Sequence, residues 1–328
     1  MNQRWGLTIP LSGIPLPEQA ELVRALPGWG YTDVWSSEVS GADAFTPLAL
    51  ASVWQPELRL GTAIVPVYTR GPALIAQSAA TLAAAAAGRF SLGLGASSPA
   101  IVEQWNGIAF DRPYRRSRDV LRFVRSALAG EKVSGDFDSF SVRGFRLENV
   151  PEQPVEVLLA ALRPQMLALA GAEADGAILN WLAADDVSKC LDAMGNPAAQ
   201  TVARIFVVPT EDREYARTVG RRLIAAYLTV PAYAEFHRWL GREPALGELW
   251  RLWAAGERAA AAASVADDVV DALVLSGSPV ECRAQVERYV RAGIKVPVLA
   301  VLPTPEMTGA EAVAEILAGL APDQARRD

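Results

Sequence analysis

Residues 58–95 read LRLGTAIVPVYTRGPALIAQSAATLAAAAAGRFSLGLG, and their pattern decides the fold class. The apolar run Leu58–Ile64 predicts a buried strand, and the alanine-rich segment Pro72–Ala87 predicts a helix with proline in its first turn. A second apolar run, Phe90–Leu94, predicts another strand. A strand, a helix and a strand in this order predict a parallel sheet.

The same alternation continues in both directions from this stretch. Short apolar or β-branched runs predict eight strands, at Trp5–Ile9, Thr32–Ser36, Leu58–Ile64, Phe90–Leu94, Val155–Ala160, Gly176–Leu179, Val202–Val208 and Val296–Leu302. Helical segments lie between and after them, at Pro17–Leu26, Phe45–Val53, Pro72–Ala87, Tyr114–Ala129, Pro164–Gly171, Ala184–Met194, Glu214–Leu228, Pro279–Ala292 and Gly309–Leu320. Eight such units favour closure into a barrel over an open doubly wound sheet. We therefore expect an α/β fold, a TIM (β/α)8 barrel that forms a single domain over residues 1–328.

Two segments absorb the length beyond the roughly 250 residues that such a barrel needs. Residues 131–150, an insertion after strand 4, alternate and turn like a small hairpin. Residues 229–271, an insertion after strand 7, are rich in aromatic residues at their start and in alanine at their end. Both follow strands on the catalytic side, so we expect them to wall or cap a pocket. The alternative for the second is a helical hairpin that only packs on the barrel.

The composition excludes several kinds of site. The chain has 328 residues, of which 51% are hydrophobic and 21% charged, as is typical of a compact globule. Its one histidine, His237, and its two cysteines, Cys190 and Cys282, rule out multi-histidine metal sites, CxxC redox motifs and four-thiolate zinc sites. We therefore expect no metal. A net charge of −6 also argues against a nucleic-acid partner.

The sequence carries no pattern typical of export or membrane insertion. The apolar run near the N-terminus is broken by Pro10, unlike the core of a secretory signal. The weakly polar stretch Pro72–Gly88 is too short and too little hydrophobic to cross a bilayer. We expect a cytoplasmic protein with reduced cysteines and no membrane partner, and a homodimer is the assembly to test.

Function in a barrel concentrates in the loops after each strand, and here these loops are polar, aromatic and glycine-rich. Glu38 follows the second strand and is a candidate acid, base or hydrogen-bond acceptor, although a neighbouring arginine would give it a structural role instead. Glu103 is a second candidate, and Trp105 and Asn106 complete the rim. A serine triad is a poor alternative because its only imidazole, His237, lies in the late insertion.

Small residues at the strand ends predict a ligand there. Gly95 would let a flat ring approach the mouth, and Ser97 and Ser98 can donate hydrogen bonds to it. Gly93 and Gly95 lack the third glycine of a dinucleotide motif, and relief of crowding is the alternative explanation for both. Arg163 stands at the start of a predicted helix, where free N–H groups favour an anion such as phosphate.

Several stretches together resemble the bacterial luciferase-like superfamily, the luciferase-like monooxygenases, and within it the branch that uses the deazaflavin coenzyme F420. They are residues 31–38 (YTDVWSSE), 61–72 (GTAIVPVYTRGP), 88–98 (GRFSLGLGASS), 158–166 (LLAALRPQM), 179–182 (LNWL), 233–240 (YAEFHRWL) and 277–283 (GSPVECR). The likeness covers nearly the whole chain, and it rests on the order and spacing of these stretches rather than on any one motif.

The resemblance implies a β/α barrel with a late insertion and a flavin-like ring at the C-terminal mouth. With the rim residues above, it gives a cofactor-binding set of Ser36, Ser37, Ala63, Ile64, Val65, Gly95, Ser97, Ser98, Asn180 and Trp181, and a phosphate site at Ala160, Ala161, Leu162 and Arg163. In the deazaflavin branch a non-proline cis peptide ends strand three, and the matching bond here is Ala63–Ile64. The chain departs from the family in two places: Arg163 stands where relatives often have glycine, and residues 36–38 stand where some present histidine.

The leading hypothesis is an F420-dependent oxidoreductase that transfers a hydride between the deazaflavin and a small organic substrate. Trp105, Asn106 and His237 would contact that substrate, and Glu38 or Glu103 would supply or accept the accompanying proton. Two alternatives stay open. The first is an FMN-dependent monooxygenase that uses flavin reduced elsewhere, and the second is a non-catalytic protein that binds deazaflavin or a metabolite.

Overall fold

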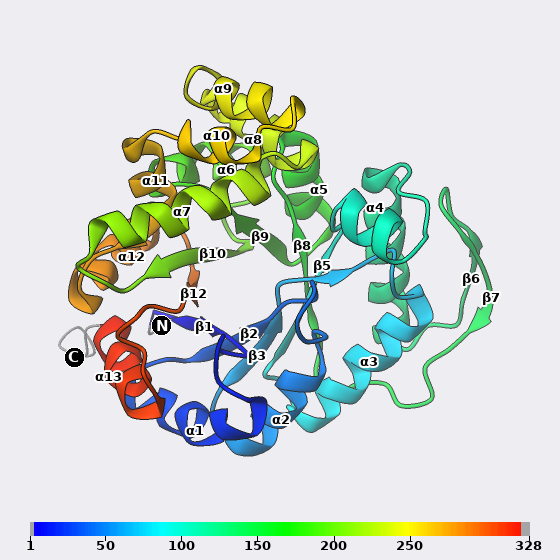
Figure 1. Cartoon of the computed structure of the whole chain (residues 1–328). Coiled ribbons are helices and arrows are strands. Elements are labelled where there is room, and N and C mark those ends of the chain that lie inside the picture. The colour runs from blue at the N-terminus through cyan, green and yellow to red at the C-terminus, as the bar shows by residue number, and fades with distance from the viewer. Residues whose placement is uncertain (1–2, 323–328) are drawn as a thin grey trace.

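A closed parallel barrel inside a ring of helices is the centre of the molecule, shown by a computed structural model that describes residues 3–322 (Figure 1). Its strands, in order around the barrel, are β1 (Gly6–Thr8), β2 (Asp33–Ser36), β3 (Arg59–Thr62), β5 (Phe90–Gly95), β8 (Glu156–Ala160), β9 (Gly176–Asn180), β10 (Gln200–Val208) and β12 (Val296–Val301). β12 pairs with β1 and closes the circle. Two short strands, β4 (Val65–Pro66) and β11 (Val274–Ser276), pair with β5 and with the end of β10. The predicted TIM barrel is confirmed.

The helices of the ring confirm the predicted alternation, with ends that differ by a few residues. They are α1 (Ala20–Trp29), α2 (Thr46–Trp54), α3 (Pro72–Ala85), α4 (Pro113–Leu128), α5 (Pro164–Glu173), α6 (Val187–Met194), α7 (Arg213–Leu228), α12 (Pro279–Arg291) and α13 (Ala310–Leu320). Proline occupies the first position of α3, α4, α5 and α12, where its missing N–H costs nothing. Every helix among residues 3–322 is too short or too polar to span a bilayer.

A single indole fills much of the barrel interior. Trp35 of β2 is buried there among aliphatic side chains from β8, β9, β10 and β12. The facing positions are glycines: a Cβ at Gly61 would lie 2.3 Å from the Trp35 ring, and one at Gly6 would lie 3.0 Å from it. Gly93 is equally crowded, because its Cβ would lie 2.0 Å from the carbonyl oxygen of Thr62. Crowding is therefore the correct explanation for Gly93.

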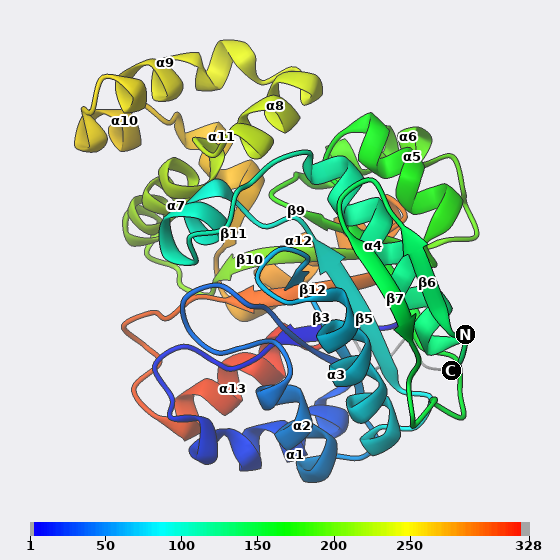
Figure 2. The same ribbon diagram turned by 90° about the vertical axis from the view of Figure 1, so that its right-hand side faces the viewer.

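The first insertion forms the predicted hairpin, which packs on α4 rather than over the barrel mouth. Its strands, β6 (Val133–Asp136) and β7 (Ser141–Phe145), pair antiparallel and lie on the outer side of α4 (Figures 1 and 2). Phe137 and Phe145 contact the ring of Phe123 on α4. The hairpin follows α4, which has already returned the chain from the mouth, so its aromatic residues cover that helix.

The second insertion consists of four helices that stand beside the barrel next to α7, as Figure 2 shows. They are α8 (Pro231–Leu240), α9 (Glu243–Ala254), α10 (Arg258–Ala263) and α11 (Asp267–Leu273). Their leucines and valines share a hydrophobic core with α7, and Trp181 and Phe206 from the ends of β9 and β10 belong to the same core. The insertion thus packs on the barrel and also reaches the C-terminal ends of two strands.

Candidate functional site at the barrel mouth

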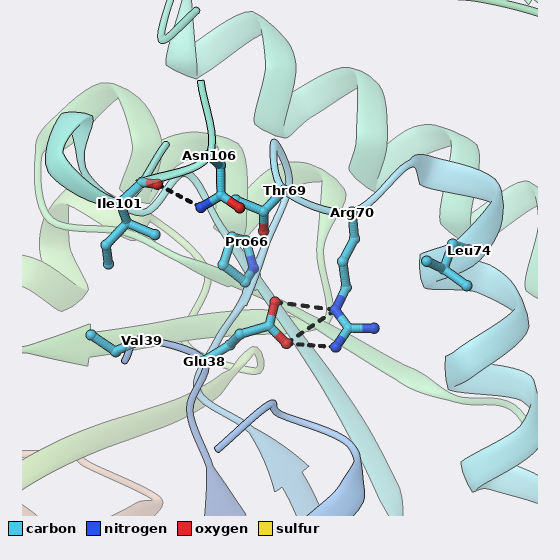
Figure 3. Close-up of a pocket in the computed structure, with 8 residues that line it drawn as sticks. All are labelled: Glu38, Val39, Pro66, Thr69, Arg70, Leu74, Ile101 and Asn106. Atoms are coloured by element: carbon cyan, nitrogen blue, oxygen red, sulfur yellow. Dashed lines mark hydrogen bonds and ion pairs between the residues drawn. The ribbon is translucent and has the colours of Figure 1, made fainter. Parts of the chain in front are cut away.

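A hollow of about 340 Å³ opens beside the C-terminal ends of β2, β3 and β5 (Figure 3). We call it the rim hollow. It is lined by Glu38, Val39, Pro66, Thr69, Arg70, Leu74, Ile101 and Asn106. Two residues predicted from the sequence, Glu38 and Asn106, therefore face the same space. Asn106 donates a hydrogen bond of 2.7 Å from Nδ2 to the carbonyl oxygen of Ile101, which orients the loop after β5.

Glu38 is held in a two-pronged ion pair with Arg70. The Arg70 Nη2 to Glu38 Oε2 distance is 2.7 Å, and Arg70 Nε lies 3.1 Å from Glu38 Oε1. The backbone N–H of Ala44 donates a further bond of 3.1 Å to Glu38 Oε2. Both charged side chains are mostly buried, with 17% of Glu38 and 20% of Arg70 exposed. The hydrogen bonds from Arg70 to Glu38 raise the pKa of the guanidinium.

A small, apolar wall forms where three strands end side by side. Gly95 lies against the side chain of Ile64 and the methyl group of Ala160, so that a Cβ at Gly95 would approach them to 2.9 and 3.0 Å. The bond Ala63–Ile64 is cis, as the family resemblance implied. The Ala63 N–H donates to the carbonyl oxygen of Ser36 at 2.6 Å, which ties this bend to the end of β2. Ile64, Gly95 and Ala160 therefore form one surface, which we call the mouth wall.

Polar and aromatic side chains continue the mouth beyond β8, at the ends of β9 and β10. Asn180 Nδ2 donates a bond of 2.9 Å to the hydroxyl of Tyr233 on α8. The Trp181 ring stacks on Phe206 with 4.2 Å between centroids, and Tyr227 lies 5.1 Å from the same indole. Trp181 has a φ of 55°, in the left-handed region that non-glycine residues rarely adopt. Strained backbone of this kind gathers at functional sites.

The comparison with protein families decides the assignment. The model of the luciferase-like monooxygenases matches residues 3–295. The chain belongs to the luciferase-like monooxygenase family. The expectation of an oxidoreductase of this family is thereby confirmed.

Individual luciferase-like proteins resemble the chain over nearly its full length. A Mycobacterium tuberculosis protein, provisionally named a coenzyme F420-dependent oxidoreductase, is 28% identical over 91% of this chain and 95% of its own length. The coenzyme F420-dependent tetrahydromethanopterin reductase of Methanopyrus kandleri superposes with a TM-score of 0.76 at 19% identity, covering 98% of this chain and 99% of that one. The oxygenating constituent of 3,6-diketocamphane monooxygenase from Pseudomonas putida, in complex with FMN, gives 0.65 at 15%, covering 98% and 97%.

Within this luciferase-like barrel, the other predicted residues lie at different depths. Ser36 is buried and donates its hydroxyl to the carbonyl oxygen of Ala44. Ser97 is partly buried in the loop after β5, with a left-handed φ of 68°. Ser37, Ser98 and Leu162 are partly buried, Val65 and Ala161 are buried, and Arg163 is exposed immediately before α5.

Of the predicted catalytic and substrate residues, three are not brought to the rim hollow or the mouth wall. Glu103 is exposed, and its Oε1 accepts a bond of 3.1 Å from the Phe110 N–H. Trp105 is 57% exposed on the same short helical turn, Ala100–Trp105. His237 has no exposed surface at all, so its ring cannot contact a substrate in this conformation. The expected substrate contact at His237 is wrong on this ground.

Sequence reasoning passed over three residues that matter to the mouth. Arg70 follows the third predicted strand, and this position could have indicated that it lies at the rim. Tyr233 is an aromatic residue at the start of an insertion, where packing is the usual role. Arg204 is a charged residue inside the otherwise apolar run Val202–Val208, and a charge within a predicted buried strand is the signal that could have found it.

Proposed function

We propose that this chain is an F420-dependent oxidoreductase that transfers a hydride between the deazaflavin and a small organic substrate at the C-terminal mouth of the barrel. The observation that carries the proposal is the mouth wall, where the side chains of Ile64 and Ala160 close over Gly95 and offer a flat aromatic ring an apolar surface. The F420-dependent names among the relatives support the choice of ring.

The residues at the mouth fit such a group. The ring would rest on the mouth wall, and unpaired polar atoms lie at its edge: Asn180 Oδ1 is buried without a hydrogen-bond partner. The phosphate would lie near Arg163, beside the first N–H groups of α5, where the helix dipole favours an anion. When bound, the deazaflavin supplies or accepts the hydride.

The chain's own side chains would position the reactants and handle the proton. Trp181, Phe206 and Tyr227 form an aromatic cluster that keeps water away from one side of the mouth. Glu38 lines the rim hollow, and its pairing with Arg70 holds the carboxyl group in place there. We therefore propose Glu38 as the proton acceptor in the direction that oxidises the substrate.

A side-by-side titration tests the cofactor. We expect oxidised F420 to bind with a dissociation constant at least tenfold lower than that of FMN, followed by quenching of tryptophan fluorescence and by the rise in melting temperature. Tight binding of FMN alone would overturn the proposal in favour of a flavin-dependent monooxygenase. Binding of F420 without turnover of any alcohol, aldehyde or ketone in a broad panel would indicate a non-catalytic binding protein.

Glu38→Gln tests the proton acceptor. We expect turnover to fall at least tenfold while the dissociation constant of F420 changes less than about threefold, because the amide keeps the shape of the side chain but cannot take a proton. The matched control is Asp43→Asn, since Asp43 Oδ1 lies 3.6 Å from Arg70 Nη2 and its loss removes a similar charge. Equal losses of turnover in the two variants would mean that Glu38 acts only through the charge of Arg70.

A further inference from the structure

Arg204 points into the barrel although it lies in the middle of β10. Val202, two residues earlier, belongs to the cluster that fills the barrel interior. Side chains two positions apart share a face of a strand, so Arg204 faces inward, one layer nearer the C-terminal mouth. Its partner in β9 is Asn180, which is likewise two residues beyond an interior residue, Ile178. The two polar side chains therefore stand next to each other above an apolar floor.

The guanidinium of Arg204 has no protein partner that would neutralise it. Among residues 3–322 it forms no ion pair and no hydrogen bond, and its Nε is buried without a partner. The guanidinium lies over the face of the Phe206 ring, where Cζ lies 4.8 Å from the centroid. By contrast, Arg70 across the mouth is fully paired with Glu38. An arginine that is half buried and unpaired is costly unless a ligand supplies the missing charge.

The neighbours of Arg204 add a second donor. The Tyr233 hydroxyl accepts its bond from Asn180 Nδ2, which leaves its own proton free to donate. Burial raises the pKa of Tyr233 to about 12, so the hydroxyl stays protonated at neutral pH.

We propose that Arg204, with Tyr233, binds a carboxylate group of the substrate. A planar guanidinium matches the two oxygens of a carboxylate, and the aromatic Phe206 beside it suits an apolar body on the same molecule. Tyr233 lies on α8 of the second insertion, outside the barrel strands that form the mouth wall, and we therefore assign this group to the substrate. The assignment to a substrate rests on the proposed function, whereas carboxylate binding by Arg204 does not.

The test compares benzoate with benzamide, two probes of the same shape that differ in charge. Ligand-observed NMR titrations on the full chain, without cofactor, should give a dissociation constant for benzoate about tenfold lower than for benzamide. Arg204→Gln should remove this preference, and Arg204→Lys should retain part of it because the charge remains. The control is Arg222→Gln, an exposed arginine on α7, which should keep the full preference.

Two results would overturn the assignment. Wild-type protein could bind both probes equally, or the preference for benzoate could persist in Arg204→Gln with its fold intact by circular dichroism. The F420 titration of the same wild-type sample separates this outcome from a failure of the proposed function. If the protein does not bind F420 but still prefers benzoate through Arg204, the cofactor assignment is contradicted. The carboxylate site is then still supported.

Discussion

Gly93→Ala is expected to lower the free energy of unfolding by about 3 kcal/mol or more. The new Cβ would lie 2.0 Å from the Thr62 carbonyl oxygen and 2.3 Å from Ile178 Cδ1. The Thr62 hydroxyl bonds to both backbone groups of Gly93, donating at 3.0 Å and accepting at 2.8 Å. The two strands are therefore pinned together at the point where the methyl group would have to push them apart. Urea unfolding followed by circular dichroism measures the loss.

Gly41→Ala is the matched control for this substitution. A Cβ at Gly41 would meet nothing within 4 Å, so its stability should stay within about 0.5 kcal/mol of wild type. Equal stability of Gly93→Ala and wild type would show that β3 and β5 can separate freely and would contradict the steric argument.

Acid should destabilise the protein through its single histidine. Burial, and then the nearby charge of Arg242, lower the pKa of His237 from 6.5 to about 3. The unfolded chain therefore takes up a proton before the folded chain does, and the stability that the neutral ring contributes is lost as the pH falls from about 6.5 toward 3. Between pH 7 and pH 5 this loss amounts to about 2 kcal/mol.

His237→Phe isolates that contribution. We expect the free energy of unfolding of this variant to fall by about 2 kcal/mol less than that of wild type between pH 7 and pH 5. The comparison uses the change with pH in each protein, so a constant packing cost of the larger ring cancels. His237→Leu provides a second variant of different shape. The same pH dependence in all three proteins would mean that His237 takes up its proton at the same pH in the folded and the unfolded state, which would contradict the prediction.

The barrel could be predicted from the sequence because the pattern that determines it lies within short segments of the chain. Apolar runs alternate along the chain with amphipathic or alanine-rich segments, several of which begin with proline, and this leaves few other ways to bury their apolar faces. The position of the hairpin could not be read in this way. Residues 131–150 cover α4 because Phe123 presents an aromatic face there, and such a contact appears only once the chain is folded.

The residues of the candidate site could likewise be predicted only in part from the sequence. Gly93 and Gly95 look alike in the sequence and both are crowded, but Gly93 is crowded by the backbone of Thr62 and Gly95 by the side chains of Ile64 and Ala160 at the mouth wall. Glu38 was visible as a strand-end carboxylate, whereas its pairing with Arg70 depends on the path of the loop after β4. Strand position indicates which residues reach the rim, and packing decides what each one contacts.

The Trp35 side chain fills the barrel interior below the mouth, so that a ligand can enter the mouth from the C-terminal end. Because the indole and its aliphatic neighbours close the interior below the mouth, a ligand that enters from the C-terminal end finds no exit at the other. If a cofactor and a substrate share this closed end, as we propose, we expect the one that lies deeper to bind first and to leave last. The filling of the barrel by Trp35 would then set the order of binding.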